Sequence, residues 1–92
     1  MTNSIFDAVF DEDLKKVQEL LQEDSNQANA VQNDMTPLLW ACQLGYAEIV
    51  NALLRFGADP NQPADDGEMP LHIASFEGEK ECVQSLLANG AI

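Results

Sequence analysis

The sequence repeats itself with a period of 33 residues. When residues 34–59 are aligned with residues 67–92, ten of the 26 positions carry the same amino acid, whereas roughly two identities are expected by chance. The same shift applied backwards finds a third, weaker copy at the start of the chain. There the period is kept by Ile5, Ala8, Val17, Leu20 and Leu21. Such a period is typical of proteins in which one small unit stacks against the next.

Each copy predicts two short helices. In the middle copy Thr36 is a helix-capping residue, Pro37 fits the first turn of a helix, and Gly45 ends that helix. Apolar residues follow at helical spacing in the segment 49–54, and Gly57 can end this second helix in a left-handed conformation. Helices of about ten residues are marginal alone. The copies must therefore be stabilised by packing side by side.

The outer copies follow the same plan with weaker signals. Ser4, with an acidic residue three positions later, resembles a capping box before the first helix, and Lys15–Glu23 carries the second apolar stripe. Met69 stands where Thr36 stands in the middle copy, so we expect its helix to lack about 1 kcal/mol of capping. The polar stretches Asp24–Met35 and Gly57–Met69 predict loops or tight hairpins.

The composition excludes several classes of function. The formal charge of −12 disfavours nucleic acid and anionic membranes, because few basic side chains are present to contact phosphate. The sequence has neither a long apolar run nor the basic start of a secretory signal, so we expect a protein without a membrane segment. Two cysteines without a metal or disulfide framework favour an intracellular location, cytoplasmic or nuclear.

The motifs together resemble the ankyrin repeat family. The middle copy matches best, with Thr-Pro-Leu at its start in Thr36–Leu38, and Leu-Leu-x-x-Gly-Ala-Asp at its end in Leu53–Asp59. The resemblance implies an all-α solenoid of three helix-turn-helix repeats joined by short hairpin loops. It also implies a single domain over residues 1–92, with repeats of about 1–33, 34–66 and 67–92, the first acting as an N-terminal cap.

Three departures from the family pattern affect the expected turns. Glu12 replaces the glycine between the two helices of repeat one, and the loop that follows this repeat runs one residue late. Asp34 takes a hairpin glycine position, but the pair Asn33-Asp34 can still form a turn because both residues tolerate unusual φ angles. A terminal repeat tolerates such changes because only one side of it is packed.

The resemblance implies that function lies in a concave surface of inner helices and hairpin tips that binds another protein. The positions of this chain that match the family's variable, partner-facing positions are Phe10, Asp11, Gln32, Asn33, Met35, Gln43, Leu44, Phe56, Asp65, Asp66, Glu68, Phe76, Glu77 and Asn89.

Three of these positions are spaced by the repeat. Stacking would place Phe10, Gln43 and Phe76 in one row, beside a second row of Asp11, Leu44 and Glu77. Aromatic rings flanked by carboxylates suit a partner with apolar anchors and basic neighbours, for example a basic segment. Alternatively, both phenylalanines pack into the core between repeats, and the acidic residues only keep the domain soluble.

The sequence offers little for catalysis, and we expect no enzyme activity, no cofactor and no metal site. His72 is the only histidine, and a structural role is favoured over general-base catalysis. Cys42 and Cys82 occupy apolar positions, which favours buried thiols over a disulfide or a reactive pair. Asp65–Glu68 lacks the complete pattern of a calcium loop. By resemblance Asn61 is a candidate for hydroxylation, although a structural role in the hairpin is favoured.

The end of repeat three lacks a polar outer face, which a terminal repeat needs. We expect the chain to be the N-terminal part of a longer protein, or this end to be covered by a partner or a second copy. The main functional hypothesis is a non-catalytic scaffold that binds a protein through an acidic concave face. The alternative is a regulatory or targeting segment of a longer enzyme. Both a monomer and end-to-end self-association through repeat three remain open.

Overall fold

The computed structural model describes residues 4–92 as a helical solenoid. Repeat one contains α1 (Ile5–Phe10) and α2 (Leu14–Glu23), followed by a short 3₁₀ helix, η1 (Ser25–Asn29). Repeat two contains α3 (Pro37–Leu44) and α4 (Ala47–Arg55), and repeat three contains α5 (Pro70–Phe76) and α6 (Lys80–Ala88). No strand is present in this part of the chain beyond an isolated bridge between Gln32 and Met35. The predicted all-α class is confirmed.

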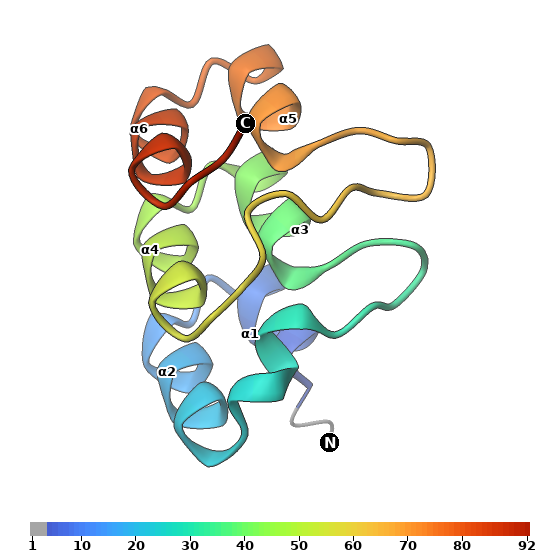
Figure 1. The fold of residues 1–92 in the computed structure, drawn as a ribbon. Coiled ribbons are helices and arrows are strands. Elements are labelled where there is room, and N and C mark those ends of the chain that lie inside the picture. The colour runs from blue at the N-terminus through green and yellow to red at the C-terminus, as the bar shows by residue number, and fades with distance from the viewer. Residues whose placement is uncertain (1–3) are drawn as a thin grey trace.

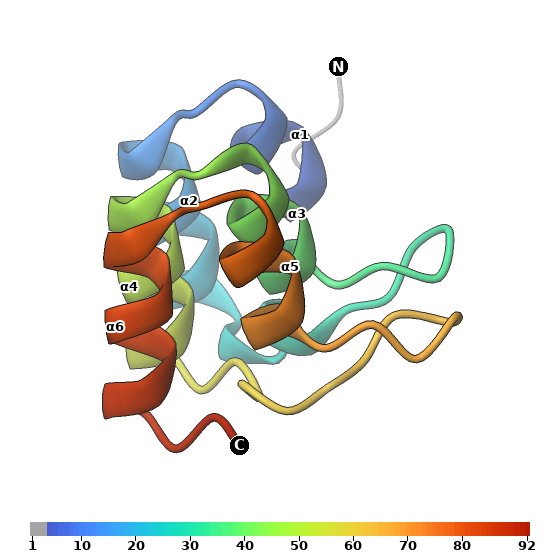
Figure 2. The same cartoon turned by 90° about the horizontal axis from the view of Figure 1, so that it is seen from above.

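The helices form two parallel columns (Figure 1). In the inner column α1 packs against α3 and α3 against α5, and in the outer column α2 packs against α4 and α4 against α6. The loops before α3 and before α5 project from the inner column on the side away from the outer column (Figure 2). Inner helices and projecting hairpins thus share one side of the molecule, as the family resemblance implies.

The helix starts follow the expected capping chemistry. The Thr36 hydroxyl accepts a hydrogen bond from the Leu39 N–H at 3.2 Å, and Ser4 accepts one from the Phe6 N–H at 3.1 Å. Met69 makes no side-chain capping bond to α5, because a methionine side chain has no oxygen to accept one. Helix α2 begins one residue earlier than predicted, at Leu14, because Asp13 caps it by accepting from the Lys16 N–H.

The turn between the two helices is the same in every repeat. The backbone N–H groups of Asp13, Tyr46 and Glu79 donate to carbonyls five residues earlier, at 2.9 to 3.0 Å. The residue before each donor is left-handed, with φ of 54° at Glu12, 76° at Gly45 and 73° at Gly78. The turn therefore demands this conformation even where glycine is missing, and Glu12 adopts it at a cost that glycine avoids.

The stretch between repeats one and two is more regular than predicted. Asp24 accepts a hydrogen bond from the Asn26 N–H and thereby starts η1, whose Ala28 is buried in the core. A loop is predicted for residues 25–29 because the polar residues of this segment show no helical period. That prediction is wrong here. The predicted Asn33-Asp34 turn is confirmed: their φ angles are 54° and 65°, and Gln32 and Met35 exchange two backbone hydrogen bonds across it.

Two asparagines link each repeat to the next. The Asn29 amide donates to the Gly57 carbonyl at 2.9 Å and accepts from the Asp59 N–H at 2.7 Å. Asn61 repeats this arrangement, donating to the Gly90 carbonyl at 3.1 Å and accepting from the Ile92 N–H at 3.0 Å. The two asparagines are 32 rather than 33 residues apart, which fits the predicted one-residue delay after repeat one. The expected structural role of Asn61 is thus present.

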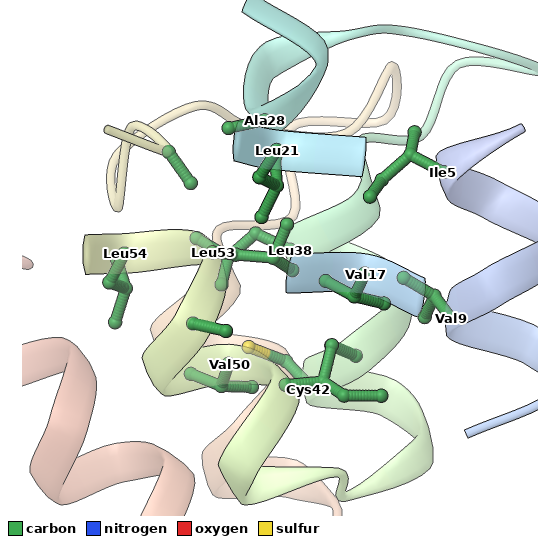
Figure 3. Close-up of a cluster of buried hydrophobic side chains, with 14 of the residues drawn as sticks. Ile5, Val9, Val17, Leu21, Ala28, Leu38, Cys42, Val50, Leu53 and Leu54 are labelled. Atoms are coloured by element: carbon green, nitrogen blue, oxygen red, sulfur yellow. The ribbon is translucent and has the colours of Figure 1, made fainter. Parts of the chain in front are cut away.

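The core lies between the columns and is continuous through all repeats. Figure 3 shows apolar side chains from both columns, among them Val17, Leu21, Leu38 and Leu53, meeting in one cluster. Cys42 lies in this cluster, and both cysteines are free and buried, as the apolar positions predict. Burial of these stripes against neighbouring repeats stabilises helices too short to persist alone.

The end of repeat three exposes side chains that are covered in repeat two. Leu54 is 7% exposed because repeat three packs over it, whereas the equivalent Leu87 is 54% exposed. Ile92 is also almost fully exposed. Repeat three therefore leaves apolar side chains open to solvent at positions that a following repeat would cover.

Candidate protein-binding surface

The inner helices carry the residues predicted to form a row. Phe10 and Phe76 are the last residues of α1 and α5, and Gln43 is the last but one of α3. Because these helices stack in order, the three residues occupy equivalent places at the ends of neighbouring helices. Gln43 is exposed, as are Asp11, Leu44 and Glu77 of the second row.

The two phenylalanines differ in their surroundings. Phe10 is 44% exposed, and its ring packs edge to face against Trp40, with ring centroids 5.1 Å apart and planes at 83°. Phe76 is 89% exposed. Neither ring belongs to the buried core, so the interpretation of both as core residues is wrong. Phe10 has a partner within the domain, whereas Phe76 leaves its aromatic surface available to another molecule.

A cavity of about 220 Å³ lies between α3, α5 and the loop before α5. The expected binding residues that line it are Met35, Gln43, Asp66, Glu68, Phe76 and Glu77, and the other lining residues are Ala64 and Ile73. These last two are not among the residues expected from the sequence. Ile73 precedes Phe76 by three residues, a spacing that places both on one helix face and could have identified it.

The loop before α5 places two of the carboxylates at the cavity. The Ala64 N–H donates to the Glu68 carbonyl at 2.8 Å, and Gly67, with φ of 87°, allows the chain to turn between them. Asp66 accepts a hydrogen bond from the Glu68 N–H at 3.0 Å, which orients its carboxylate. The turn thus fixes Asp66 and Glu68 beside the apolar residues of α5.

The charge at this cavity is entirely negative. Asp66 and Glu68 come from the hairpin and Glu77 from the end of α5. The chain has four basic residues, and all lie on outer helices: Lys15 and Lys16 on α2, Arg55 on α4 and Lys80 on α6. None of them lines the cavity. A positively charged group from another molecule would meet no competing cation from residues 4–92 there.

The remaining predicted residues are spread more widely. Gln32, Asn33 and Asp65 are exposed at the hairpins, and Asn89 is exposed after α6. The two hairpins are neighbours, because the Asp65 N–H donates to the Asp34 carbonyl at 3.3 Å. Phe56 directly follows α4 in the outer column, is half-buried and packs against the core. Of the predicted residues, Phe56 and Asn89 follow outer helices, so the fold places both apart from the inner helices and hairpins.

The comparison with known families matches this architecture. A family model described as "Ankyrin repeats (3 copies)" matches residues 5–92. The chain belongs to the ankyrin repeat family. Ankyrin repeats are in general modules for protein–protein interaction, and ankyrin domains are generally non-catalytic.

Solved and curated ankyrin proteins show how much is shared. The crystal structure of an ankyrin repeat domain from Acinetobacter baumannii AYE has a TM-score of 0.89 and 35% identity, over 96% of this chain and 47% of that one. Human BCL-6 corepressor-like protein 1 is 40% identical over 72 residues, 77% of this chain. The mouse 2-5A-dependent ribonuclease is 39% identical over 77 residues, 82% of this chain. The chain spans only 4% and 10% of the lengths of these two relatives.

The two cysteines and the histidine considered in the sequence lie in surroundings that do not favour catalysis. Burial, and to a lesser extent the nearby Cys82 thiol, raises the pKa of Cys42 from 9.0 to about 12. Burial, with Glu79 and Glu81 as smaller causes, also raises the pKa of Cys82. Both thiols of this ankyrin domain therefore stay protonated near neutral pH, and a protonated thiol is a poor nucleophile. His72 is exposed on α5 and does not line the cavity.

Proposed function

We propose that this ankyrin domain is a scaffold that binds a basic segment of another protein through the acidic concave side formed by its inner helices and hairpins. The carrying observation is the combination of an exposed Phe76 ring with three carboxylates at one cavity. An aromatic anchor surrounded by charge is a common centre of binding energy in protein interfaces. A formal charge of −12 adds attraction toward basic segments.

A binding experiment with defined peptides tests this proposal. Fluorescence anisotropy would compare a peptide with lysine, arginine and leucine residues against an acidic peptide of equal length. We expect only the basic peptide to bind, with affinity falling strongly as salt is raised across the range where the Debye length falls from about 10 to 3 Å.

A double variant identifies the surface used. Leu44→Ala combined with Phe76→Ala should weaken binding at least tenfold, on the scale of about 1.4 kcal/mol or more for an interface anchor. Glu19→Ala combined with Gln22→Ala, at exposed positions of α2, is the matched control and should leave binding unchanged. Equal binding by both double variants would contradict the proposed surface, and salt-independent binding would contradict the role of charge.

A second function is compatible with the first. The domain could be the regulatory or targeting segment of a longer enzyme, and the similarity to a part of a ribonuclease supports this. The reading frame of the source transcript tests it directly: a catalytic domain encoded in frame after Ile92 would support the proposal. A stop codon at that point would contradict it.

The proposal also concerns the assembly state, because repeat three exposes apolar side chains at its end. Leu87 and Ile92 are exposed apolar side chains that are either solvated in a monomer or covered in end-to-end association. Sedimentation velocity over a range of concentrations distinguishes the two states, and Leu87→Glu should abolish any association. We further propose an intracellular location, cytoplasmic or nuclear, which the free thiols of Cys42 and Cys82 support.

A further inference from the structure

We propose that the cavity between α3, α5 and the second hairpin receives one arginine side chain of the partner protein. This inference rests on the proposed function and makes its partner more specific. The cavity volume of about 220 Å³ is below the roughly 300–1,000 Å³ of pockets that enclose whole small molecules. The space therefore suits a single long side chain presented by a larger molecule.

The apolar residues of the cavity suit the aliphatic part of such a side chain. Met35 comes from the first hairpin, Ala64 from the second, and Ile73 from α5, and the exposed Phe76 ring completes this surface. Met35, Ala64 and Ile73 are all half-buried, so the domain leaves part of each side chain open to contact with another molecule. Long basic side chains place their methylene groups on surfaces of this kind and keep the charged end in water.

The carboxylates lie around this surface from two directions. Asp66 and Glu68 belong to the hairpin, whereas Glu77 follows α5. Within residues 4–92 no three acidic, histidine or cysteine side chains come together closely enough to hold a metal ion. A side-chain cation placed between the hairpin and the end of α5 would reduce the repulsion between these carboxylates.

The helix ends add to the same field. Both α3 and α5 end at this cavity, and neither has a basic residue in its last turn. The carboxyl end of a helix carries partial negative charge that attracts cations. Two uncompensated helix ends thus reinforce the three carboxylates.

The chemistry favours arginine over lysine. A guanidinium group has five donors in a planar fork and can bind more than one carboxylate, whereas an ammonium group acts as a compact charge. The guanidinium plane also stacks on aromatic rings, and the ring of Phe76 is exposed for this contact. Carboxylates on two sides and an open ring together match an arginine head group.

An NMR titration of the labelled ankyrin domain tests the inference. The probes are acetylated Gly-Arg-Gly amide and its lysine and citrulline counterparts, of which citrulline keeps the shape of arginine without its charge. We expect the arginine peptide to shift the amide signals of the lining residues at the lowest concentration, the lysine peptide to bind more weakly, and the citrulline peptide to leave them unchanged.

Charge-removing variants locate the site. Glu68→Gln and Glu77→Gln should each lower the affinity for the arginine peptide by roughly two- to fivefold, which is the scale of exposed ion pairs. Glu19→Gln changes the net charge equally on α2 and should have no such effect. Phe76→Leu should reduce the preference for arginine over lysine, because it removes the ring and keeps an apolar side chain.

The outcomes separate this inference from the proposed function. Equal binding of the arginine and lysine peptides, or equal loss in Glu19→Gln and Glu77→Gln, would overturn the arginine site. If the arginine peptide leaves the lining residues unshifted while the longer basic peptide still requires Leu44 and Phe76, the proposed function stands and the arginine site fails. Loss of both kinds of binding would overturn both.

Discussion

The carboxyl group of Glu79 lies over Gly45, so close that a Cβ atom built on Gly45 would be 2.5 Å from it. Gly45 ends α3 in repeat two, and Glu79 precedes α6 in repeat three. The glycine therefore serves two purposes: it allows the left-handed turn, and it makes room for a side chain of the next repeat. The equivalent Gly78 has the same conformation but no neighbouring atom within 4 Å of such a Cβ.

This pair of glycines gives a matched test of the contact between repeats. Gly45→Ala and Gly78→Ala should each lower the free energy of unfolding by about 1–2 kcal/mol, because an L-residue is strained in this conformation. Gly45→Ala should lower the free energy of unfolding slightly more than Gly78→Ala, because the Glu79 side chain must move away from the new methyl group. Urea unfolding measures both. In a Glu79→Ala background the two losses should become equal, and an excess loss that persisted at Gly45 would contradict the role given to Glu79.

Replacing Glu12 should stabilise the domain. Glu12 occupies the same left-handed turn position with φ of 54°. Glu12→Gly should raise the free energy of unfolding by about 0.5–1 kcal/mol, because relief of backbone strain exceeds the added entropy of the unfolded chain. Glu12→Ala keeps the strain and is the control. A glycine variant no more stable than the alanine variant in urea unfolding would show that the turn is unstrained.

The hydrogen bonds of Asn29 and Asn61 predict a loss of stability when either side-chain amide is removed. Asn61→Ala removes the bonds to Gly90 and Ile92 and should destabilise the domain by about 1–2 kcal/mol, the net value of two hydrogen bonds. Asn29→Ala should behave alike in the link between repeats one and two. Asn26→Ala, in the exposed η1 segment, is the control. Thermal unfolding with indistinguishable midpoints for Asn26→Ala and Asn61→Ala would count against the links.

Burial of Cys42 predicts a dependence of stability on alkaline pH. Its pKa is raised from 9.0 to about 12, so above pH 9 the unfolded chain releases the thiol proton while the folded chain still holds it. The stabilising contribution is therefore complete below pH 9 and declines as the pH rises toward 12. Chemical unfolding across this range should show the stability advantage over Cys42→Ala shrinking with pH. A difference that stayed constant would mean that the thiol titrates normally.

The regular part of the fold was predictable because its signals are local and recur. Thr36, Pro37 and Gly45 act on their own helix, and the 33-residue period shows which apolar residues must meet. The helix η1 was missed because it depends on a capping bond from Asp24 and on the burial of one alanine, Ala28. A polar segment without periodicity contains no sign of either.

The candidate site was predictable in position but not in detail. The family resemblance led to Phe10 and Phe76, yet only packing separates a ring held by Trp40 from one left in solvent. Ile73 and Ala64 line the cavity because the second hairpin folds beside α5, which is a relationship between elements rather than a property of either segment. Phe56 matched a family position, but the outer helix α4 carries it to the core.

The contrast between Leu54 and Leu87 makes the domain unequal along its axis. Repeat two is packed against a neighbour on both sides, whereas repeat three is packed on one, so the amides of repeat three should exchange with solvent sooner than those of repeat two. The cavity at α3, α5 and the hairpins spans the border between these two repeats. A partner bound there would hold repeat three against the better supported repeat two, so binding would also slow the local opening of repeat three.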